Sequence, residues 1–420
     1  MGKQLLLTFF YAQVEERKLE PLFGVLIAHL SRCLTHIDPS IQQDGLSLMD
    51  SLVTAVPAFI AAHYVKILPD CLEQISSKKC DEKAKVGVSA NVSDKISSLQ
   101  WRIDVLKRVD KVLEAILDSR QLRQSSLENG ATVDLSYDEG DLFCEVFPGR
   151  PESLCFVDLI PQTGEDAMVD IVDRILPLII ESWVEAATDT KRRGSSIVSN
   201  QVFPLLEIIA PILEKLVMYA QVVAGEDALG ATRPKESALL HHIRSKYLDD
   251  LHSRLLSRLP FSNSSGRCNA QNIVLCNVAT HLAGSSLGED MLARIISLAG
   301  SQTTSPAQRL KVLASLLAGG DLCTDKRNSV LDLIVELSRC PDSEPPHLAQ
   351  TIKLLSGLAE REPDRLGPWL ASLPVLVTTS ELGLVEPILR TILKLIQRKN
   401  PCLEKSLKEN WNCFQGINMI

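Results

Sequence analysis

One pattern recurs along most of the chain: an apolar stripe with helical spacing, followed by a short break. In its first occurrence Leu22, Val25, Leu26 and Leu30 share one face of a helix, at i, i+3, i+4 and i+8. Asp38-Pro39 follows, with an acid suited to an N-cap and a proline suited to a first helical position. Breaks this short place successive helices antiparallel beside one another.

The same reading predicts helices over most of the remaining chain. The second helix contains Ile41 and Leu52, and a third begins at Pro57 and runs through Leu68. Residues 76–98 are polar and predict a loop. Further helices are predicted over residues 100–119, 166–187, 199–224, 236–259, 271–283, 287–300, 306–318, 326–339, 346–360, 365–377 and 381–398. No extended stretch alternates with the period of two that marks a strand.

These helices predict an all-α fold, an α-solenoid of the HEAT or armadillo kind with repeats of about 40–47 residues. The chain has 420 residues, more than one compact core accommodates, so it forms either several domains or one elongated, repetitive domain. Residues 1–125 are assigned to an N-terminal helical-repeat domain and 165–420 to a continuing solenoid. Residues 126–164 are too long for an ordinary connection and predict an exposed insertion, linker or partner-binding segment. Because the first helix has no preceding cap, we expect that the N-terminal end of a longer solenoid is missing.

Charge and cysteine content narrow the possible partners and compartments. The net charge of −8 disfavours direct nucleic-acid binding, which depends on neutralising phosphates with Lys and Arg. Eleven cysteines occur singly, as expected of reduced thiols in a cytosolic or nuclear protein. The N-terminal 18 residues resemble an amphipathic helix rather than a signal peptide, and no membrane span is predicted. Lys191-Arg192-Arg193 fits a solvated turn better than a nuclear-localisation patch.

Two groups of residues superficially match catalytic or metal sites. Gly284-Ser-Ser286-Leu-Gly288 fits the nucleophile elbow of hydrolases, but a helical pattern precedes it where the elbow needs a strand, and only His347 follows. A turn with a serine N-cap is the better interpretation. The second group contains His241, His242, Asp249, Asp250 and His252, of which only Asp249 and His252 have a metal-ligand spacing. A solvated helix face is the better interpretation of this group. We therefore predict no enzymatic activity, no cofactor and no metal.

Five strings in the chain resemble, in the same order, a known family. The first is Leu22-Phe23, Ala28-His29-Leu30, Leu34-Thr-His36-Ile37 and Ile41-Gln-x-Asp44, followed by Asp50 and Pro57. The next are Gln100-Trp101-Arg102 with Leu106 and Arg108, and the run from Leu176 through Glu181 and Trp183 to Glu185-Ala186. The last two are Tyr247-Leu-x-Asp250 with Ser257-Arg-Leu-Pro260, and Trp369-Leu-Ala-x-Leu-Pro374. The chain thereby resembles the testis-expressed protein ten family, pre-rRNA-processing subunits of the Rix-type complex.

The resemblance implies a helical-repeat subunit of a nucleolar complex bound to the precursor of the large (60S) ribosomal subunit. Its implied partners are a proline-, glutamate- and leucine-rich scaffold protein and a WD40-repeat protein, with an AAA-type remodelling ATPase and a SUMO protease as further associates. The implied location is the nucleus, in nucleolus and nucleoplasm. The chain lacks the family's basic N-terminal extension and ends soon after the fifth string, so we expect a shortened form.

The function implied by the resemblance is a non-catalytic scaffold in pre-rRNA processing and large-subunit maturation. A HEAT or armadillo adaptor that binds protein cargo, in transport or in chromatin-associated complexes, is the alternative. Such adaptors line their concave face with a ladder of like residues, which this sequence does not show. Candidate partner-contact residues, for which a role in the structural core is the competing interpretation, are His29, His36, Asp44, Trp101, Arg102, Glu181, Trp183 and Trp369.

Overall fold

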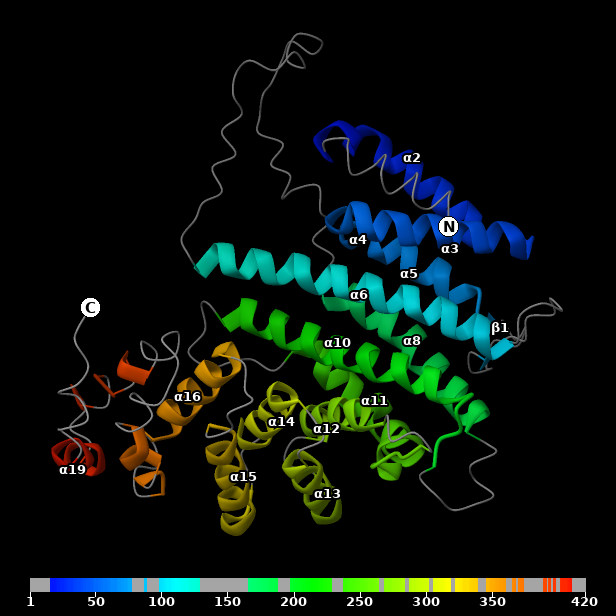
Figure 1. Cartoon of the computed structure of the whole chain (residues 1–420). Helices are drawn as coiled ribbons and strands as arrows, with labels where there is room; N and C mark the ends of the chain where they lie inside the picture. The colour runs from blue at the N-terminus through cyan, green and yellow to red at the C-terminus, as the bar shows by residue number, and fades with distance from the viewer. Residues whose placement is uncertain are drawn as a thin grey trace, which may run out of the picture. The chain divides into compact units, whose positions relative to one another are not determined.

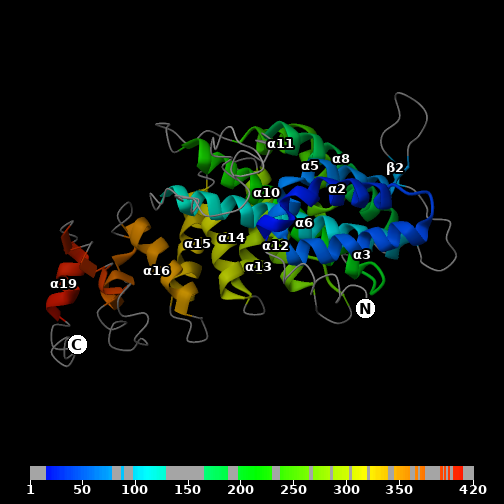
Figure 2. The same ribbon diagram turned by 90° about the horizontal axis from the view of Figure 1, so that it is seen from above.

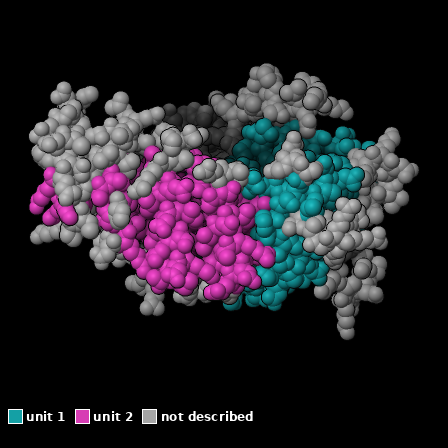
Figure 3. All heavy atoms as spheres, turned by 60° about the horizontal axis from the view of Figure 1, so that its bottom comes forward, with its two compact units in different colours: residues 1–271 teal, residues 272–420 magenta. Residues whose placement is uncertain are grey.

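The computed structural model is all-α over the part of the chain that it describes. The described residues are 16–77, 87–88, 98–128, 165–187, 197–228, 237–263, 268–283, 287–301, 305–318, 322–338, 345–359, 365–367, 369–373, 388–390, 392–393, 396–397 and 401–409. They divide into two compact units, residues 1–271 and 272–420, coloured separately in Figure 3.

Unit 1 begins with an antiparallel pair, α2 (Glu16–Leu34) and α3 (Pro39–Ala55). Asp38 caps α3 as predicted, because its side chain accepts a hydrogen bond from the Ser40 backbone N–H at 2.9 Å. Gly45 lets the two helices approach closely, since a Cβ there would lie 2.9 Å from the Cβ of Cys33.

The apolar face predicted for the first helix is only partly right. Leu30 is buried, but Leu22 and Val25 are 60% and 58% exposed. The residues that α2 buries against α3 and α5 form a neighbouring stripe at i, i+4, i+7 and i+11, namely Phe23, Ile27, Leu30 and Leu34. Two apolar stripes therefore run along α2, and α3 and α5 cover only one of them.

The third predicted helix is two helices, α4 (Pro57–Ala62) and α5 (Tyr64–Glu73). The break lies at His63, whose backbone N–H bonds to the Ile60 carbonyl at 3.2 Å rather than continuing the α-helical ladder. Its ring Nδ1 lies 3.0 Å from the Phe59 carbonyl, the acceptor that the His63 N–H would use in an unbroken helix. The side chain thus replaces the backbone bond at the break.

The polar stretch predicted as a loop contains a very short hairpin. β1 (Ser76–Ser77) pairs antiparallel with β2 (Gly87–Val88), and the residues between them lie outside the described part. After it come α6 (Ser98–Glu128), α8 (Glu165–Ala186), α10 (Phe203–Ala228), α11 (Ala238–Arg254) and the 3-10 turn Leu256–Arg258. The predicted insertion at 126–164 lies outside the described residues except for the end of α6.

The helices of unit 1 form two layers. Figures 1 and 2 show α3, α6 and α10 side by side, with α5, α8 and α11 behind them in the view of Figure 1. The contacts agree, because α6 packs on α3 and α10 within its layer, and on α5 and α8 across the layers. Each helix thus packs chiefly on helices close to it in chain order.

Unit 2 contains α12 (Asn269–Ala283), which begins just before its boundary, and α13 (Glu289–Gly300), α14 (Pro306–Ala318), α15 (Thr324–Leu337), α16 (Pro345–Ala359) and α19 (Pro401–Glu409). Buried Arg309 of α14 donates from Nε to the Ala299 carbonyl at 2.6 Å, which satisfies an end group of α13. The helices predicted over 365–377 and 381–398 lie partly outside the described residues.

Candidate interaction surface

Three predicted contact residues lie on α2, on α3 and in the turn between these helices. His29 and Asp44 are exposed, and His36 is half-buried, with its Nδ1 accepting the Asp38 backbone N–H at 3.0 Å. Between them Ile37 is 95% exposed. A large apolar side chain so fully in water does not stabilise the fold, so it is available to a partner. We call His29, His36, Ile37 and Asp44 the hairpin end.

The three predicted tryptophans are buried in the described structure. Trp101, Trp183 and Trp369 are 4%, 2% and 1% exposed. Trp183 of α8 donates from Nε1 to the Arg254 carbonyl of α11 at 3.1 Å, and its ring meets Phe261 edge-on at 5.3 Å between centroids. The tryptophan thereby satisfies a carbonyl at the last turn of α11 and joins two helices.

Arg102 forms a contact within the fold. Buried Arg102 of α6 donates from Nη1 to Glu185 Oε2 at 2.6 Å, which links α6 to α8. Glu181 is half-buried on α8. Arg102 and Glu185 come from two different resemblance strings, and their pairing is a contact that neither string could reveal alone.

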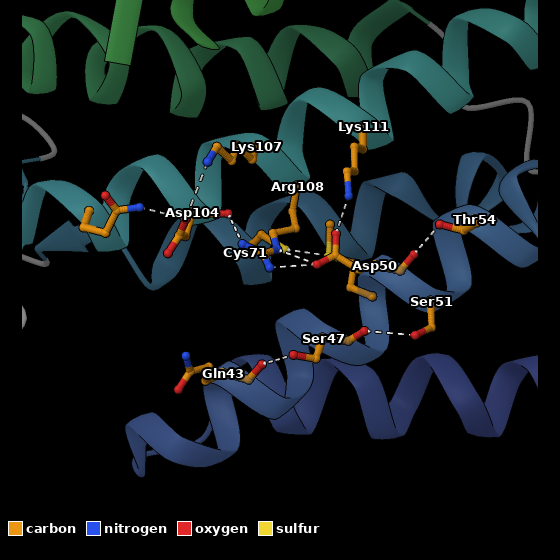
Figure 4. A network of polar contacts seen from close by, with 12 residues as sticks. Gln43, Ser47, Asp50, Ser51, Thr54, Cys71, Asp104, Lys107, Arg108 and Lys111 are labelled. Atoms are coloured by element: carbon orange, nitrogen blue, oxygen red, sulfur yellow. Dashed lines mark hydrogen bonds and ion pairs between the residues drawn. The ribbon is translucent and has the colours of Figure 1, made fainter. Parts of the chain in front are cut away.

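A second pair of residues from those strings, Asp50 of α3 and Arg108 of α6, meets in the polar network of Figure 4. Arg108 donates to Asp50 Oδ2 from Nε at 3.1 Å and from Nη2 at 2.7 Å. Its Nη1 donates to the Asp104 carbonyl at 2.7 Å, and Lys111 Nζ donates to Asp50 Oδ1 at 2.8 Å. The network therefore fastens α3 to α6 through largely buried charges.

Lys215 of α10 extends the charged contacts to a third helix. Its Nζ lies 2.9 Å from Asp110 Oδ1 and 3.2 Å from Glu114 Oε2, both on α6. Burial raises the pKa of Asp110 above its usual value, and the hydrogen bond from Lys215 only partly offsets this.

Beside these contacts lies an open cavity of about 320 Å³, lined by Asp50, Asp104, Lys107, Arg108, Asp110, Lys111 and Ile208. The acids and bases of this cavity are engaged with one another or with Lys215. The network is thus a structural joint rather than a free ionic site.

The histidine-rich part of α11 forms a polar joint with α8. Asp173 Oδ1 lies 2.6 Å from His242 Nε2 and accepts the Tyr247 hydroxyl at 2.9 Å, while Oδ2 accepts Lys246 Nζ at 2.6 Å. Burial alone would raise the pKa of Asp173, but these three hydrogen bonds outweigh burial and lower it. Burial, followed by the bond to Asp173, raises the pKa of Tyr247 to about 12. None of these partners could be inferred from spacing, because Asp173 lies in a different predicted helix.

One serine–histidine contact, which the sequence did not indicate, occurs in unit 2. Ser315 Oγ of α14 lies 2.9 Å from His281 Nε2 and 3.0 Å from Asn277 Oδ1 of α12, and also 2.8 Å from the Lys311 carbonyl. Ser315 lies inside a helix, where backbone N–H groups are already engaged and cannot stabilise an oxyanion. The contact is accordingly a polar link between α12 and α14.

The sequence motifs set aside above occur in helical surroundings. The elbow-like Gly284–Ser286 lies outside the described residues, but α12 precedes it as a helix. The N-cap of α13 is Gly288, so the predicted serine N-cap is wrong. His347 lies in the first turn of α16 as predicted. Among the described residues, no group of three potential metal ligands comes together. No described helix is both long and apolar enough to cross a membrane.

Comparison with known proteins finds a family that the N-terminal helices resemble. Residues 17–113 match the model of a family described as a Rix1 complex component involved in 60S ribosome maturation. The predicted resemblance is confirmed. The matched range contains the hairpin end and both halves of the Asp50–Arg108 pair.

A curated relative supports the same resemblance over more of the chain. The testis-expressed protein 10 homolog of Danio rerio is 24% identical over 294 residues, which cover 61% of this chain. They cover 30% of the relative, so the chain spans less than a third of that protein's length.

Proposed function

We propose that the chain is a non-catalytic scaffold subunit of a nuclear complex that processes pre-rRNA and matures the large ribosomal subunit. The match of residues 17–113 to a Rix1 complex component carries this proposal. The relative from Danio rerio supports it, because the similarity to that protein extends well beyond the matched N-terminal helices.

The architecture that suits this role is an α-solenoid of HEAT or armadillo type. Its support is the layered packing of unit 1, in which each helix chiefly contacts helices near it in the chain. Such arrays offer extended surfaces to several partners at once. The largely buried pair Asp50–Arg108 and the pair of buried Arg102 with Glu185 would hold these helices in register while the surface binds other subunits.

The proposed partners are a proline-, glutamate- and leucine-rich scaffold protein and a WD40-repeat protein of the same complex. An AAA-type ATPase and a SUMO protease would join on the pre-60S particle, in nucleolus and nucleoplasm. The hairpin end is the proposed contact surface, because Ile37 is exposed there and the two helices that flank it carry the exposed ionisable residues His29 and Asp44. An apolar anchor with a polar surround is the usual composition of an interface hot spot.

Depletion of the protein followed by RNA analysis tests the proposal. We expect precursors of the large-subunit RNA that retain the second internal spacer to accumulate, while the small-subunit RNA matures normally. Affinity purification should recover the scaffold and WD40 proteins. Normal spacer processing after complete depletion would contradict the proposal, and recovery of importins with cargo would favour the adaptor alternative.

The same affinity purification can test whether the hairpin end is the contact surface. Ile37→Asp should reduce recovery of the scaffold partners by about tenfold or more, because a charge would replace the apolar anchor. Ile197→Asp is the matched control, since Ile197 is also an exposed isoleucine of unit 1, outside the hairpin end. Equal recovery with both variants would place the interface elsewhere.

A further inference from the structure

Ser305 directly precedes α14 and is exposed. Its carbonyl accepts the Arg309 backbone N–H at 3.0 Å, the first hydrogen bond of the helix, so Ser305 is the N-cap. Pro306, the first helical residue, has no N–H to donate. The N–H groups of Ala307 and Gln308 occupy the two positions from which an N-cap side chain accepts. The Ser305 hydroxyl therefore lies at the positive end of a 13-residue helix.

Arg309, one turn into α14, has a donor that nothing in the fold uses. The residue is 5% exposed, and its Nε donates to the Ala299 carbonyl in the last turn of α13. Its Nη2 is also buried, but it has no hydrogen-bond partner in the described part of the chain. A buried charged donor without an acceptor costs free energy. This nitrogen therefore indicates a group that supplies an acceptor at the start of α14.

A group carried by Ser305 can reach this guanidinium. Residues four apart on a helix have Cβ atoms about 5–6 Å apart, and helical side chains tilt toward the N-terminus. The side chain of Arg309 therefore leans toward the turn that begins at Ser305, and its bond to Ala299 holds it at the contact of α13 with α14 (Figure 1). A phosphoryl group would extend the serine by three acceptor oxygens and up to two negative charges.

The sequence around Ser305 points to the same group. Ser305-Pro306 is the only place in the 420 residues where a serine or threonine precedes a proline. Proline-directed protein kinases select this dipeptide. Because helix ends fray, the first turn of α14 can open far enough for a kinase to bind it. Exposure, sequence and a buried donor one turn away thus coincide at one serine.

We propose that Ser305 is a phosphorylation site and that its phosphate binds Arg309 and the N-terminus of α14. A proline-directed kinase transfers the γ-phosphoryl group of a nucleoside triphosphate to Ser305 Oγ. The Oγ–P bond forms and the bond from the γ-phosphorus to its bridging oxygen breaks. The nucleoside diphosphate leaves with that electron pair, and the hydroxyl proton passes to the aspartate of the kinase.

The phosphate would join two helices of unit 2. It caps α14 directly, and through Arg309 it is linked to the Ala299 carbonyl at the end of α13. Phosphorylation therefore stiffens the start of α14 and fixes it to α13. The proposal does not depend on the role in ribosome maturation.

Phosphorylation of the full chain by a purified cyclin-dependent kinase with ATP tests the site. Tandem mass spectrometry should locate a phosphate on Ser305. Ser305→Ala should abolish this product, and Pro306→Ala should reduce it by about tenfold or more because the kinase loses the proline that it recognises. An unmodified Ser305 in the wild-type chain, or full modification of Pro306→Ala, would overturn the proposal.

Hydrogen exchange tests the contribution of Arg309. In the wild type, phosphorylation should slow amide exchange in the first turn of α14 by about tenfold or more, because the phosphate restrains fraying. In Arg309→Gln most of this slowing should be lost. Each variant is compared with its own unphosphorylated form, which removes any effect of the substitution on folding. Arg309→Lys keeps the charge without Nη2, serves if the glutamine variant does not fold, and should also show less slowing.

Asp38→Ser provides a matched control at another helix. It places a serine before Pro39 as the N-cap of α3, with Gln42 one turn later instead of an arginine. After phosphorylation of this variant, exchange in the first turn of α3 should slow only about threefold, because the helix end acts on the phosphate alone. Equal slowing of α14 in the wild type and in both Arg309 variants would overturn the binding of the phosphate to Arg309.

Discussion

Trp183 shows how one side chain can determine the stability of unit 1. Its ring is buried between α8 and the segment that contains Phe261, and its N–H satisfies the Arg254 carbonyl. Trp183→Ala should lower the free energy of unfolding by about 3–5 kcal/mol, the usual loss for a large buried aromatic. Urea denaturation followed by circular dichroism measures it.

Trp183→Phe separates packing from hydrogen bonding. The phenyl ring keeps most of the apolar contact but loses the N–H donor, so we expect a smaller loss of about 1–2 kcal/mol. If Trp183→Ala left the unfolding free energy unchanged while partner recovery fell, the side chain would be an interface anchor and our assignment to the core would fail.

Asp173 gives the stability of unit 1 a dependence on pH. Because its pKa is lower in the folded chain than the ordinary value of 3.8, the carboxylate stabilises the fold above pH 3.8. This stabilisation is lost as pH falls through the lower folded pKa. Asp173→Asn should therefore cost about 1–2 kcal/mol at pH 7, and its difference from the wild type should shrink below pH 3.8.

The matched control for Asp173 is Asp170→Asn on the same helix. Asp170 is exposed, so its replacement should change the unfolding free energy by less than about 0.5 kcal/mol at either pH. Chemical denaturation at pH 7 and pH 3 gives both values. A constant difference between Asp173→Asn and wild type at the two pH values would show that the charge of Asp173 does not contribute.

At the scale of elements, Asp50 and Arg108 join α3 to α6 through largely buried charges. A double-mutant cycle with Asp50→Asn and Arg108→Gln should give a coupling energy of about 1–2 kcal/mol. The exposed Asp250–Arg254 pair within α11 is the control, and its coupling should be about 0.3–0.5 kcal/mol. Urea denaturation measures both coupling energies. Equal values for the two pairs would mean that burial does not strengthen the interaction between Asp50 and Arg108.

Helices could be predicted from the sequence more reliably than the faces that they bury. In α2 the residues Leu22, Val25 and Leu26 and the residues Phe23, Ile27 and Leu30 both have helical spacing. Periodicity detects each stripe equally well, whereas the positions of α3 and α5 decide which is covered. The break at His63 was also missed, because no proline or glycine marks it.

Polar contacts between distant helices were beyond prediction from one sequence. Asp50 and Arg108 were both recognised from the family resemblance, yet nothing in their spacing of 58 residues indicates that they pair. No pattern in the sequence indicated a role for Asp173, although it contacts three residues of α11. Packing of the helices brings these side chains together, and spacing within one helix carries no information about it.

At the scale of the whole chain, the net charge of −8 predicts how strongly the protein binds RNA. An acidic chain gains little from neutralising phosphates, so the purified protein should bind RNA weakly and release it at moderate salt. The assembled complex should keep its RNA under the same conditions. Filter binding at increasing salt measures both, and salt-resistant binding by the chain alone would contradict the prediction.

The order in which the helices of unit 1 are synthesised bears on how the chain folds in the cell. α6 can pack on α3, α4 and α5 as soon as it leaves the ribosome, because those helices precede it. The opposite side of α6 packs on α10, which begins only at Phe203 and is therefore synthesised later. At about 5–20 residues per second, that side stays uncovered for several seconds, long enough for a chaperone to bind the nascent chain.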